Sequence, residues 1–192
     1  MNCYLCSGTD FFPRKGKVRD APVLNILECK SCRLVTLSSL EHIPAEHYEN
    51  SGMHGDNPQS VESLLNETAV DDQRRFEMFR PLLPNKKVLD FGCGNGGYLL
   101  LAEPLAAEVT GIELEKRVQK HWKGRMKIAP SVESVGGEYD LITAFHVIEH
   151  LADPRAILKQ LGKCLAPQGR IVIEVPSSED ALLTLYECDA FQ

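Results

Sequence analysis

The sequence predicts an α/β fold, with a Rossmann-like parallel sheet behind a small cysteine-rich module. From residue 86 onward, short apolar segments alternate with helical patterns, which is the order of parallel strands joined by crossover helices. Four of the seven cysteines lie in the first 32 residues as two Cys-x-x-Cys pairs. A length of 192 residues allows one ordinary domain and a small appendage, so two full domains are not expected.

The composition is that of a globular protein. Hydrophobic residues make up 43% and charged residues 25%, which excludes disordered and fibrous classes. The net charge of −6 gives no overall attraction to nucleic acid or to an anionic membrane. No basic region followed by an apolar run opens the chain, and no stretch approaches the ~20 apolar residues that cross a bilayer. We therefore expect a cytoplasmic protein without a membrane partner.

The first cysteines have the spacing of a metal site. Cys3 and Cys6 form one pair and Cys29 and Cys32 the other, with 22 residues between the pairs. Four thiolates complete a tetrahedral sulfur site suited to Zn²⁺ and leave no position for water, which predicts a structural zinc site. A redox pair or a disulfide clasp remains an alternative. The other three cysteines are expected to stay reduced, namely Cys93, Cys164 and Cys188.

The first 85 residues are expected to form two parts. Residues 1–37 are the zinc-binding module, and its apolar residues predict short strands at Phe11, Phe12, Val18, Val23, Leu24, Ile26 and Leu27. Residues 38–85 are a connector and a helical region. The connector runs from Ser38 to Ser60, and part of it is expected to fold over a neighbouring site because Tyr48 and Met53 are apolar. Apolar spacing from Val61 to Leu83 predicts one or two amphipathic helices, ended by Pro84 and Asn85.

The remaining residues, 86–192, are expected to form the α/β domain. Strands are predicted over residues 87–91, 109–113, 126–129, 139–145 and 170–175. Helices are predicted over residues 97–107, 115–122 and 154–165. The last helix has a well-formed start, because Asp153 can cap it and Pro154 suits its first position.

The turn after the first of these strands predicts a ligand site. In an open parallel sheet the ligand lies beyond the carboxyl ends of the strands, and Gly92, Gly94 and Gly97 follow the first strand as G-x-G-x-x-G. A dinucleotide site is one interpretation. Asp90, however, would repel a pyrophosphate and attract an ammonium group. The site therefore favours a cationic ligand without phosphate.

Four segments between Lys86 and Pro176 carry a family resemblance, namely VLDFGCGNGGYL, GIELE, YDLITAFHVIEHLADP and LAPQGRIVIEVP. In order and spacing they resemble the motifs of class I S-adenosylmethionine-dependent methyltransferases. The resemblance implies that the cofactor binds at Asp90, Gly92, Cys93, Gly94, Glu113 and Leu114. Within that set, the glycines allow close backbone approach, Asp90 lies near the methionine ammonium and Glu113 accepts the two ribose hydroxyls.

The resemblance gives weaker guidance for the adenine and the methyl group. Ser131 and Val132 are placed beside the adenine ring. Phe145 and His146, at the end of the fourth strand, should face the methyl donor, with His146 as the candidate acid or base. Glu149 and His150 also match a family motif, but a hydrogen-bonded pair that holds the next helix is an equal alternative.

The cysteine module narrows the class of substrate. A CxxC…CxxC module before this domain resembles methyltransferases of deoxysugar and polysaccharide biosynthesis. It implies a small-molecule acceptor, such as a nucleotide-linked sugar. One alternative is an RNA-directed methyltransferase, to which Arg14, Lys15, Lys17, Arg19, Lys30 and Arg33 would contribute, although the acidic balance opposes nucleic acid as a partner. Another is a cofactor-binding remnant without turnover.

The sequence has no segment that matches the last strands of this family. Class I members continue past the fifth strand with a helix and an antiparallel strand pair, whereas this sequence stops 16 residues after Pro176. We expect a sheet that lacks its C-terminal strands. The exposed edge of the fifth strand would then favour association of copies into a homo-oligomer.

Overall fold

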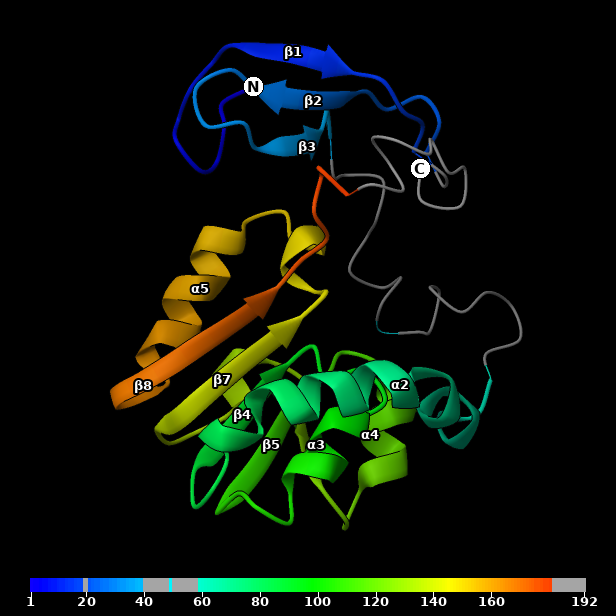
Figure 1. Ribbon diagram of the computed structural model, residues 1–192, viewed down its shortest axis with the longest axis vertical. Helices are drawn as coiled ribbons and strands as arrows, with labels where there is room; N and C mark the ends of the chain where they lie inside the picture. The colour runs from blue at the N-terminus through cyan, green and yellow to red at the C-terminus, as the bar shows by residue number, and fades with distance from the viewer. Residues whose placement is uncertain (19–20, 40–48, 50–58, 181–192) are drawn as a thin grey trace. The chain divides into compact units, whose positions relative to one another are not determined.

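The computed structural model describes residues 1–18, 21–39, 49 and 59–180 (Figure 1). The connector residues Tyr48 and Met53, and also Cys188, lie outside this part. The chain divides into two compact units. The cysteine unit comprises Met1–Ile43, Leu151–Ala156 and Pro176–Gln192, and the sheet unit comprises Pro44–His150 and Ile157–Val175.

The cysteine unit contains a three-stranded antiparallel sheet in the order β1-β2-β3. The strands are β1 (Phe11–Arg14), β2 (Ile26–Cys29) and β3 (Val35–Leu37). Val18, Val23 and Leu24 lie outside these strands, so that part of the strand prediction was wrong. Pro22 and Val23 lie in a turn, in which the Leu24 N–H donates to the carbonyl of Ala21. Residues in such a turn do not pair with a neighbouring strand, even where they are apolar.

The sheet unit begins with one long helix, α2 (Val61–Phe79). Its start is fixed by Ser60, whose hydroxyl accepts the N–H of Ser63 at 3.1 Å. The helix continues as the short 3₁₀ helix η2 (Arg80–Leu82), in which Pro81 cannot donate a backbone hydrogen bond. The predicted helical region is therefore a single helix with a tightened end.

A five-stranded parallel sheet in the order β6-β5-β4-β7-β8 forms the centre of this unit, which confirms the predicted fold class. The strands are β4 (Lys87–Phe91), β5 (Glu108–Ile112), β6 (Lys127–Ala129), β7 (Tyr139–Phe145) and β8 (Leu165–Glu174). The strand order reverses between β4 and β7. In parallel sheets such a reversal opens a crevice at the carboxyl ends of the two strands.

Three helices connect these strands, α3 (Gly97–Ala102), α4 (Lys116–Trp122) and α5 (Pro154–Lys163), and η3 (Val132–Ser134) and η4 (Ile148–His150) are short 3₁₀ turns. Right-handed crossovers on the two sides of the reversal place α3 and α5 on opposite faces. Figure 1 shows α2, α3 and α4 together on one side of the sheet and α5 on the other.

Two element boundaries differ clearly from the sequence prediction. Helix α3 ends at Ala102 and not near residue 107, because Pro104 cannot continue it. Strand β8 begins at Leu165, where the last helix was still expected, and Gln168 adopts a positive φ of 65° within it. The pairing with β7 shifts register over this stretch, so the strand is longer but irregular at its start.

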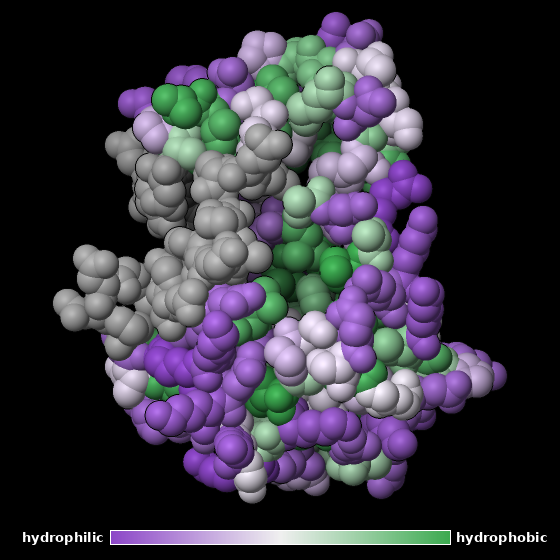
Figure 2. Space-filling view, turned by 180° about the vertical axis from the view of Figure 1, so that it is seen from behind, coloured by the Kyte–Doolittle hydropathy of each residue, from purple (hydrophilic) through white to green (hydrophobic). Residues whose placement is uncertain are grey.

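The core of the sheet unit lies between the sheet and the helices α2, α3 and α4. Its fully buried members include Leu83, Val88, Leu99, Val118 and Trp122. On the outside, hydrophilic side chains cover most of the face of this unit that Figure 2 shows. Within the described part of the chain, the helices are too short or too polar to cross a membrane.

Candidate functional site

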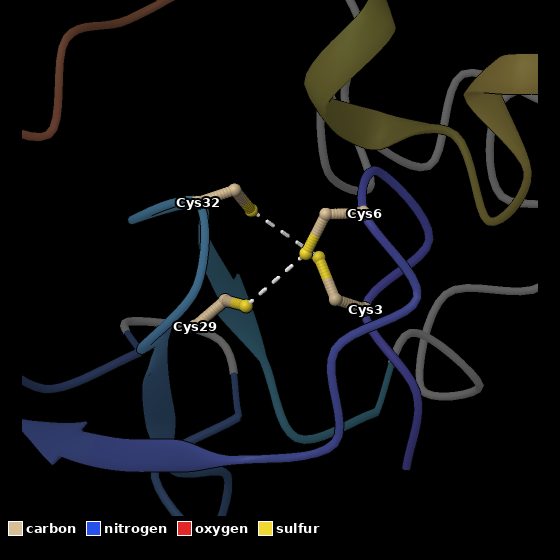
Figure 3. A group of neighbouring side chains, drawn as sticks. All are labelled: Cys3, Cys6, Cys29 and Cys32. Carbon is tan, nitrogen blue, oxygen red and sulfur yellow. Dashed lines mark hydrogen bonds between the residues drawn. The ribbon is translucent and has the colours of Figure 1, made fainter.

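The four N-terminal cysteines converge on one point (Figure 3). Their sulfur atoms all lie within 4.8 Å of one another. The Sγ atoms of Cys3 and Cys32 are 3.5 Å apart, and those of Cys6 and Cys29 are 3.6 Å apart. A tetrahedron with metal–sulfur bonds of about 2.3 Å has edges of about 3.8 Å. The cluster therefore has the size of a four-thiolate metal site, and these two distances are far longer than a disulfide bond.

Two backbone turns present the sulfur atoms. The Ser7 N–H donates to the carbonyl of Cys3 at 2.8 Å, and the Arg33 N–H donates to the carbonyl of Cys29 at 2.8 Å. Ser7 and Arg33 both have a positive φ of 64°, so the two turns share one shape. The backbone N–H of Cys32 lowers the pKa of Cys29 to about 7, and the pKa of Cys3 is also lowered, whereas the pKa values of Cys6 and Cys32 are raised.

The glycine turn after β4 is fixed to the neighbouring strand β5. The N–H groups of Gly92 and Cys93 both donate to the carbonyl of Ile112, at 2.9 and 3.0 Å. A Cβ on Gly92 would lie 2.5 Å from Val147, whereas a Cβ on Gly94 would meet no atom of the described residues within 4 Å. The side chain of Cys93 is buried and packs against Gly111, which leaves only the backbone of Cys93 for a ligand. Among the described residues, the backbone at Gly94 is therefore open to close approach.

Glu113 lies directly after β5 and reaches this turn. Its Oε2 accepts the N–H of Gly94 at 2.9 Å, and its Oε1 accepts the N–H of Glu115 at 3.0 Å. Burial raises the pKa of Glu113 despite these hydrogen bonds. A carboxylate has about four acceptor directions, so two remain for other donors.

Asp90 is the buried acid of the site. It is 3% exposed, and the hydroxyl of Thr143 donates to its Oδ1 at 2.6 Å. Burial raises the pKa of Asp90 to about 7, against the hydrogen bond from Thr143 and the charge of Arg75, which both lower it. A cationic ligand beside Asp90 would lower this pKa and favour the charged carboxylate.

The predicted adenine contacts lie around the ends of β5 and β6. Leu114 follows Glu113 and is 41% exposed, so its side chain is open to a flat apolar ring. Val132 is buried in η3. The hydroxyl of Ser131 lies 3.4 Å from that of Ser134, whose own hydroxyl donates to the Ser131 carbonyl. Ser131 is thus already engaged in capping η3.

Phe145 ends β7 with its ring packed inward. The ring stacks on Phe79 at a centroid distance of 5.7 Å and meets the edge of Tyr98 at 5.1 Å. The guanidinium of Arg75 lies 5.1 Å from the same ring. Only the backbone of Phe145 therefore remains for a ligand. Within the part of the chain that the structure describes, the buried hydroxyl of Tyr98 has no hydrogen-bond partner.

His146 lies at the carboxyl end of β7 between two carboxylates. Its Nε2 is 3.1 Å from Glu174 and its Nδ1 is 3.3 Å from Glu149. Its φ of 53° is unusual for a residue with a side chain and is typical of strained functional sites. Both ring nitrogens of His146 therefore face carboxylates. Glu149 lies 4.0 Å from His150, too far for the hydrogen-bonded pair that the sequence suggested.

The sequence patterns did not indicate the group of side chains that surrounds Glu174. Arg74 donates to both of its oxygens, at 3.1 and 2.9 Å, and Arg75 donates twice to Oε1, at 3.0 and 2.9 Å. These bonds lower the pKa of Glu174 to about 2. The group ties α2 to the carboxyl end of β8. The sequence feature that could have indicated this group is the acidic residue Glu174 within the apolar segment IVIEVP.

Most of the predicted site residues gather at one edge of the sheet. Asp90 and the glycine turn belong to β4, Glu113 follows β5 and His146 follows β7. These three strands are neighbours and parallel, so their carboxyl ends lie side by side. The arrangement brings two carboxylates, a glycine turn and an imidazole to one edge of the sheet.

Comparison with known proteins adds independent evidence. A family model described as a methyltransferase domain matches residues 61–192. The ubiquinone biosynthesis O-methyltransferase of Xanthomonas campestris pv. campestris (strain B100) is 29% identical over 151 residues, covering 71% of this chain and 60% of that protein. The ubiquinone biosynthesis O-methyltransferase of Idiomarina loihiensis is 36% identical over 101 residues, covering 45% of this chain and 40% of that protein.

A solved structure supports the fold. The sugar N-methyltransferase KedS8 from a Streptoalloteichus species matches with a TM-score of 0.50 and 18% identity, over 65% of this chain and 57% of that chain. This likeness concerns the arrangement of strands and helices. The chain spans about 60% of the length of the Xanthomonas protein and 40% of the Idiomarina protein.

Proposed function

The chain belongs to the methyltransferase domain family, as its motifs predict, and from this premise we propose that it is an enzyme that transfers the methyl group of S-adenosylmethionine to a small molecule. The matched residues, 61–192, include the whole described part of the parallel sheet. The catalytic and binding roles below are assigned to the residues at the carboxyl edge of that sheet.

The arrangement of Glu113 carries this proposal. The Gly94 and Glu115 N–H groups fix its carboxylate and use two acceptor directions. Two acceptor directions of the carboxylate remain, one for each of the two hydroxyls on the ribose of an adenosyl group. A partly desolvated carboxylate also makes stronger hydrogen bonds than one in water. Glu113 therefore holds the ribose, and Leu114 covers one side of the adenine.

Asp90 supports the same cofactor at the methionine end. An ammonium group near its buried carboxyl would restore the charge that burial opposes. The negative charge of Glu113 also contributes to the raised pKa of Asp90, so the two carboxylates lie close enough to repel each other. A pyrophosphate over the same turn would add further negative charge. The site thus favours a cationic cofactor over a dinucleotide.

His146 is assigned the proton transfer. Attack of an oxygen, nitrogen or carbon acceptor on the methyl group releases a proton from the acceptor, and a base must take it. Both ring nitrogens now face carboxylates, so one of these carboxylates must move away before a nitrogen can face the acceptor. Glu149 is the partner more easily displaced, because Arg74 and Arg75 hold Glu174 in place.

The acceptor is proposed to be a small molecule, such as a nucleotide-linked sugar. The relatives described above act in ubiquinone biosynthesis and on sugars, as their names state, and both are small-molecule chemistries. No contact among the described residues favours RNA over these acceptors.

The four cysteines are proposed to hold one structural Zn²⁺. The sulfur cluster has the size of a tetrahedral site, and its four thiolates leave no position for a substrate or a water. When bound, the metal supplies folding free energy to a module with three short strands and little core.

Calorimetric titration with S-adenosylhomocysteine tests cofactor binding, and release of S-adenosylhomocysteine from S-adenosylmethionine tests turnover. We expect micromolar or tighter binding, and turnover with members of a panel of nucleotide sugars and phenolic quinone precursors. Matched reactions with structured RNA serve as the control. Absence of cofactor binding, or turnover with RNA alone, would contradict the proposal.

A further inference from the structure

Within the cysteine unit, Arg14 joins the module to a later part of the chain. Its Nη2 donates to the carbonyl of Ser178 at 3.2 Å, and its Nη1 lies 3.3 Å from the carboxylate of Glu179. The same Nη1 donates to Glu28 at 3.2 Å. The side chain of Glu28 is 4% exposed, and Glu28 directly precedes the proposed metal ligand Cys29. One guanidinium therefore connects a buried acid beside the cluster to residues 178–179.

A second arginine makes a similar connection at the other cysteine turn. Arg155, in the first turn of α5, donates from Nη1 to the carbonyl of Tyr4 at 3.1 Å. Tyr4 lies between Cys3 and Cys6, so its carbonyl orientation depends on the turn that presents these two sulfurs. Asp153 caps the same helix by accepting the Ala156 N–H at 3.0 Å. Residues 153–156 thus form an ordered start of α5 that is bound to the first turn.

The two segments held in this way share a position in the fold. Residues 151–156 follow η4, the short turn after β7, and residues 176–180 follow β8. Both segments leave the carboxyl ends of their strands.

We infer that the cysteine module is a metal-dependent anchor for residues 151–156 and 176–180. Metal binding fixes the two cysteine turns, and with them the Tyr4 carbonyl and the Glu28–Arg14 pair that hold these segments. Loss of the metal releases both segments. The inference rests on the proposed metal site and extends it, because it gives the module a role in ordering chain outside itself. Since coupling between two sites is reciprocal, the two arginine bonds must also strengthen metal binding.

Hydrogen–deuterium exchange of the full chain tests the anchor directly. We expect removal of the metal with a chelator to speed exchange in residues 151–156 and 176–180, while β4 and β5 exchange as before. Unchanged exchange in both segments after the metal has left would overturn the inference. Elemental analysis of the starting protein keeps the two claims apart, because absence of metal there would reject the proposed metal site itself.

Two pairs of variants test the individual hydrogen bonds. Arg155→Gln leaves the sequence of residues 1–37 unchanged. A change in the rate of zinc release from this variant can therefore be attributed to loss of the bond to the Tyr4 carbonyl. We expect transfer of zinc to a chromogenic chelator to be several-fold faster in Arg155→Gln and unchanged in Lys159→Gln, one turn further along α5. Arg14→Gln should speed exchange in residues 176–180 with zinc still bound, and Lys17→Gln should not. Wild-type release from Arg155→Gln together with wild-type exchange in Arg14→Gln would overturn the inference.

Discussion

The hydroxyl of Thr143 donates a 2.6 Å hydrogen bond to Oδ1 of Asp90, across the two strands between which the strand order reverses. The two residues are opposite one another in the register of β4 and β7, and both are buried. The bond stabilises the charged form of Asp90, but burial outweighs it and raises the pKa to about 7. The charge of Asp90 therefore changes near neutral pH, and we expect cofactor binding to depend on pH.

We predict that affinity for S-adenosylhomocysteine falls as the pH drops below about 7. The ligand ammonium binds the ionised carboxyl, so a protonated Asp90 must lose its proton when the ligand binds. Below this pKa, the affinity should therefore fall by up to about tenfold per pH unit. Titration calorimetry between pH 5.5 and 8.5 measures this. Thr143→Val removes a bond that lowers the pKa, so its midpoint should move to higher pH. A flat profile in the unmodified protein would show that Asp90 does not contact the ammonium.

Asp90→Asn should stabilise the ligand-free protein at pH 8. The pKa of about 7 in the folded state exceeds the ordinary value of about 3.9 in the unfolded state, so stability is lost as the pH rises through this range. Asparagine resembles the protonated acid and avoids that loss. Thermal unfolding should show a higher midpoint for the variant at pH 8 and a smaller difference at pH 5.

Asp140→Asn is the matched control for this measurement. The backbone N–H of Lys87 lowers the pKa of Asp140, so its charged form stabilises the folded state. Loss of that charge should therefore lower the unfolding midpoint at pH 8. A shift in the same direction for both variants would refute the assignment of a costly buried charge to Asp90.

Glu113→Ala should weaken S-adenosylhomocysteine binding at least tenfold. The substitution removes the two proposed bonds to the ribose hydroxyls, and hydrogen bonds to charged groups contribute roughly 1.5 to 3 kcal/mol each. Glu103→Ala, at the exposed end of α3, should bind like the unmodified protein. Equal dissociation constants for the two variants would mean that the ribose lies elsewhere.

Replacement of a cluster cysteine should remove one equivalent of zinc. Cys29→Ser takes one of four ligands from the tetrahedron, and the free energy of metal binding is part of the folding free energy of such a module. Elemental analysis should find zinc near one per chain in the unmodified protein and in Cys164→Ser, and far less in Cys29→Ser. Full zinc content in Cys29→Ser would place the metal outside the cluster.

The sequence was sufficient for features that depend on local pattern. The bounds of β4 and β7 agree with their apolar segments, and the cysteine spacing identified the side chains that converge. Features that depend on distant partners were not accessible. Glu174 is tied to Arg74 and Arg75 across about a hundred residues, and no local pattern encodes that pairing. Similarly, nothing in the segment TAFHVIEH shows that both nitrogens of His146 face carboxylates.

His146→Ala should reduce turnover by roughly 10²- to 10⁴-fold, the usual contribution of a general base, with little change in S-adenosylhomocysteine affinity. The imidazole lies at the end of β7 beside the proposed cofactor site, where a base must receive the acceptor proton. His150→Ala is the matched control, since it removes a neighbouring exposed imidazole that is not assigned to proton transfer. Single-turnover rates with saturating cofactor separate the chemical step from binding. If His146→Ala retains the unmodified rate, the base lies elsewhere and the two carboxylates hold His146 for a structural purpose.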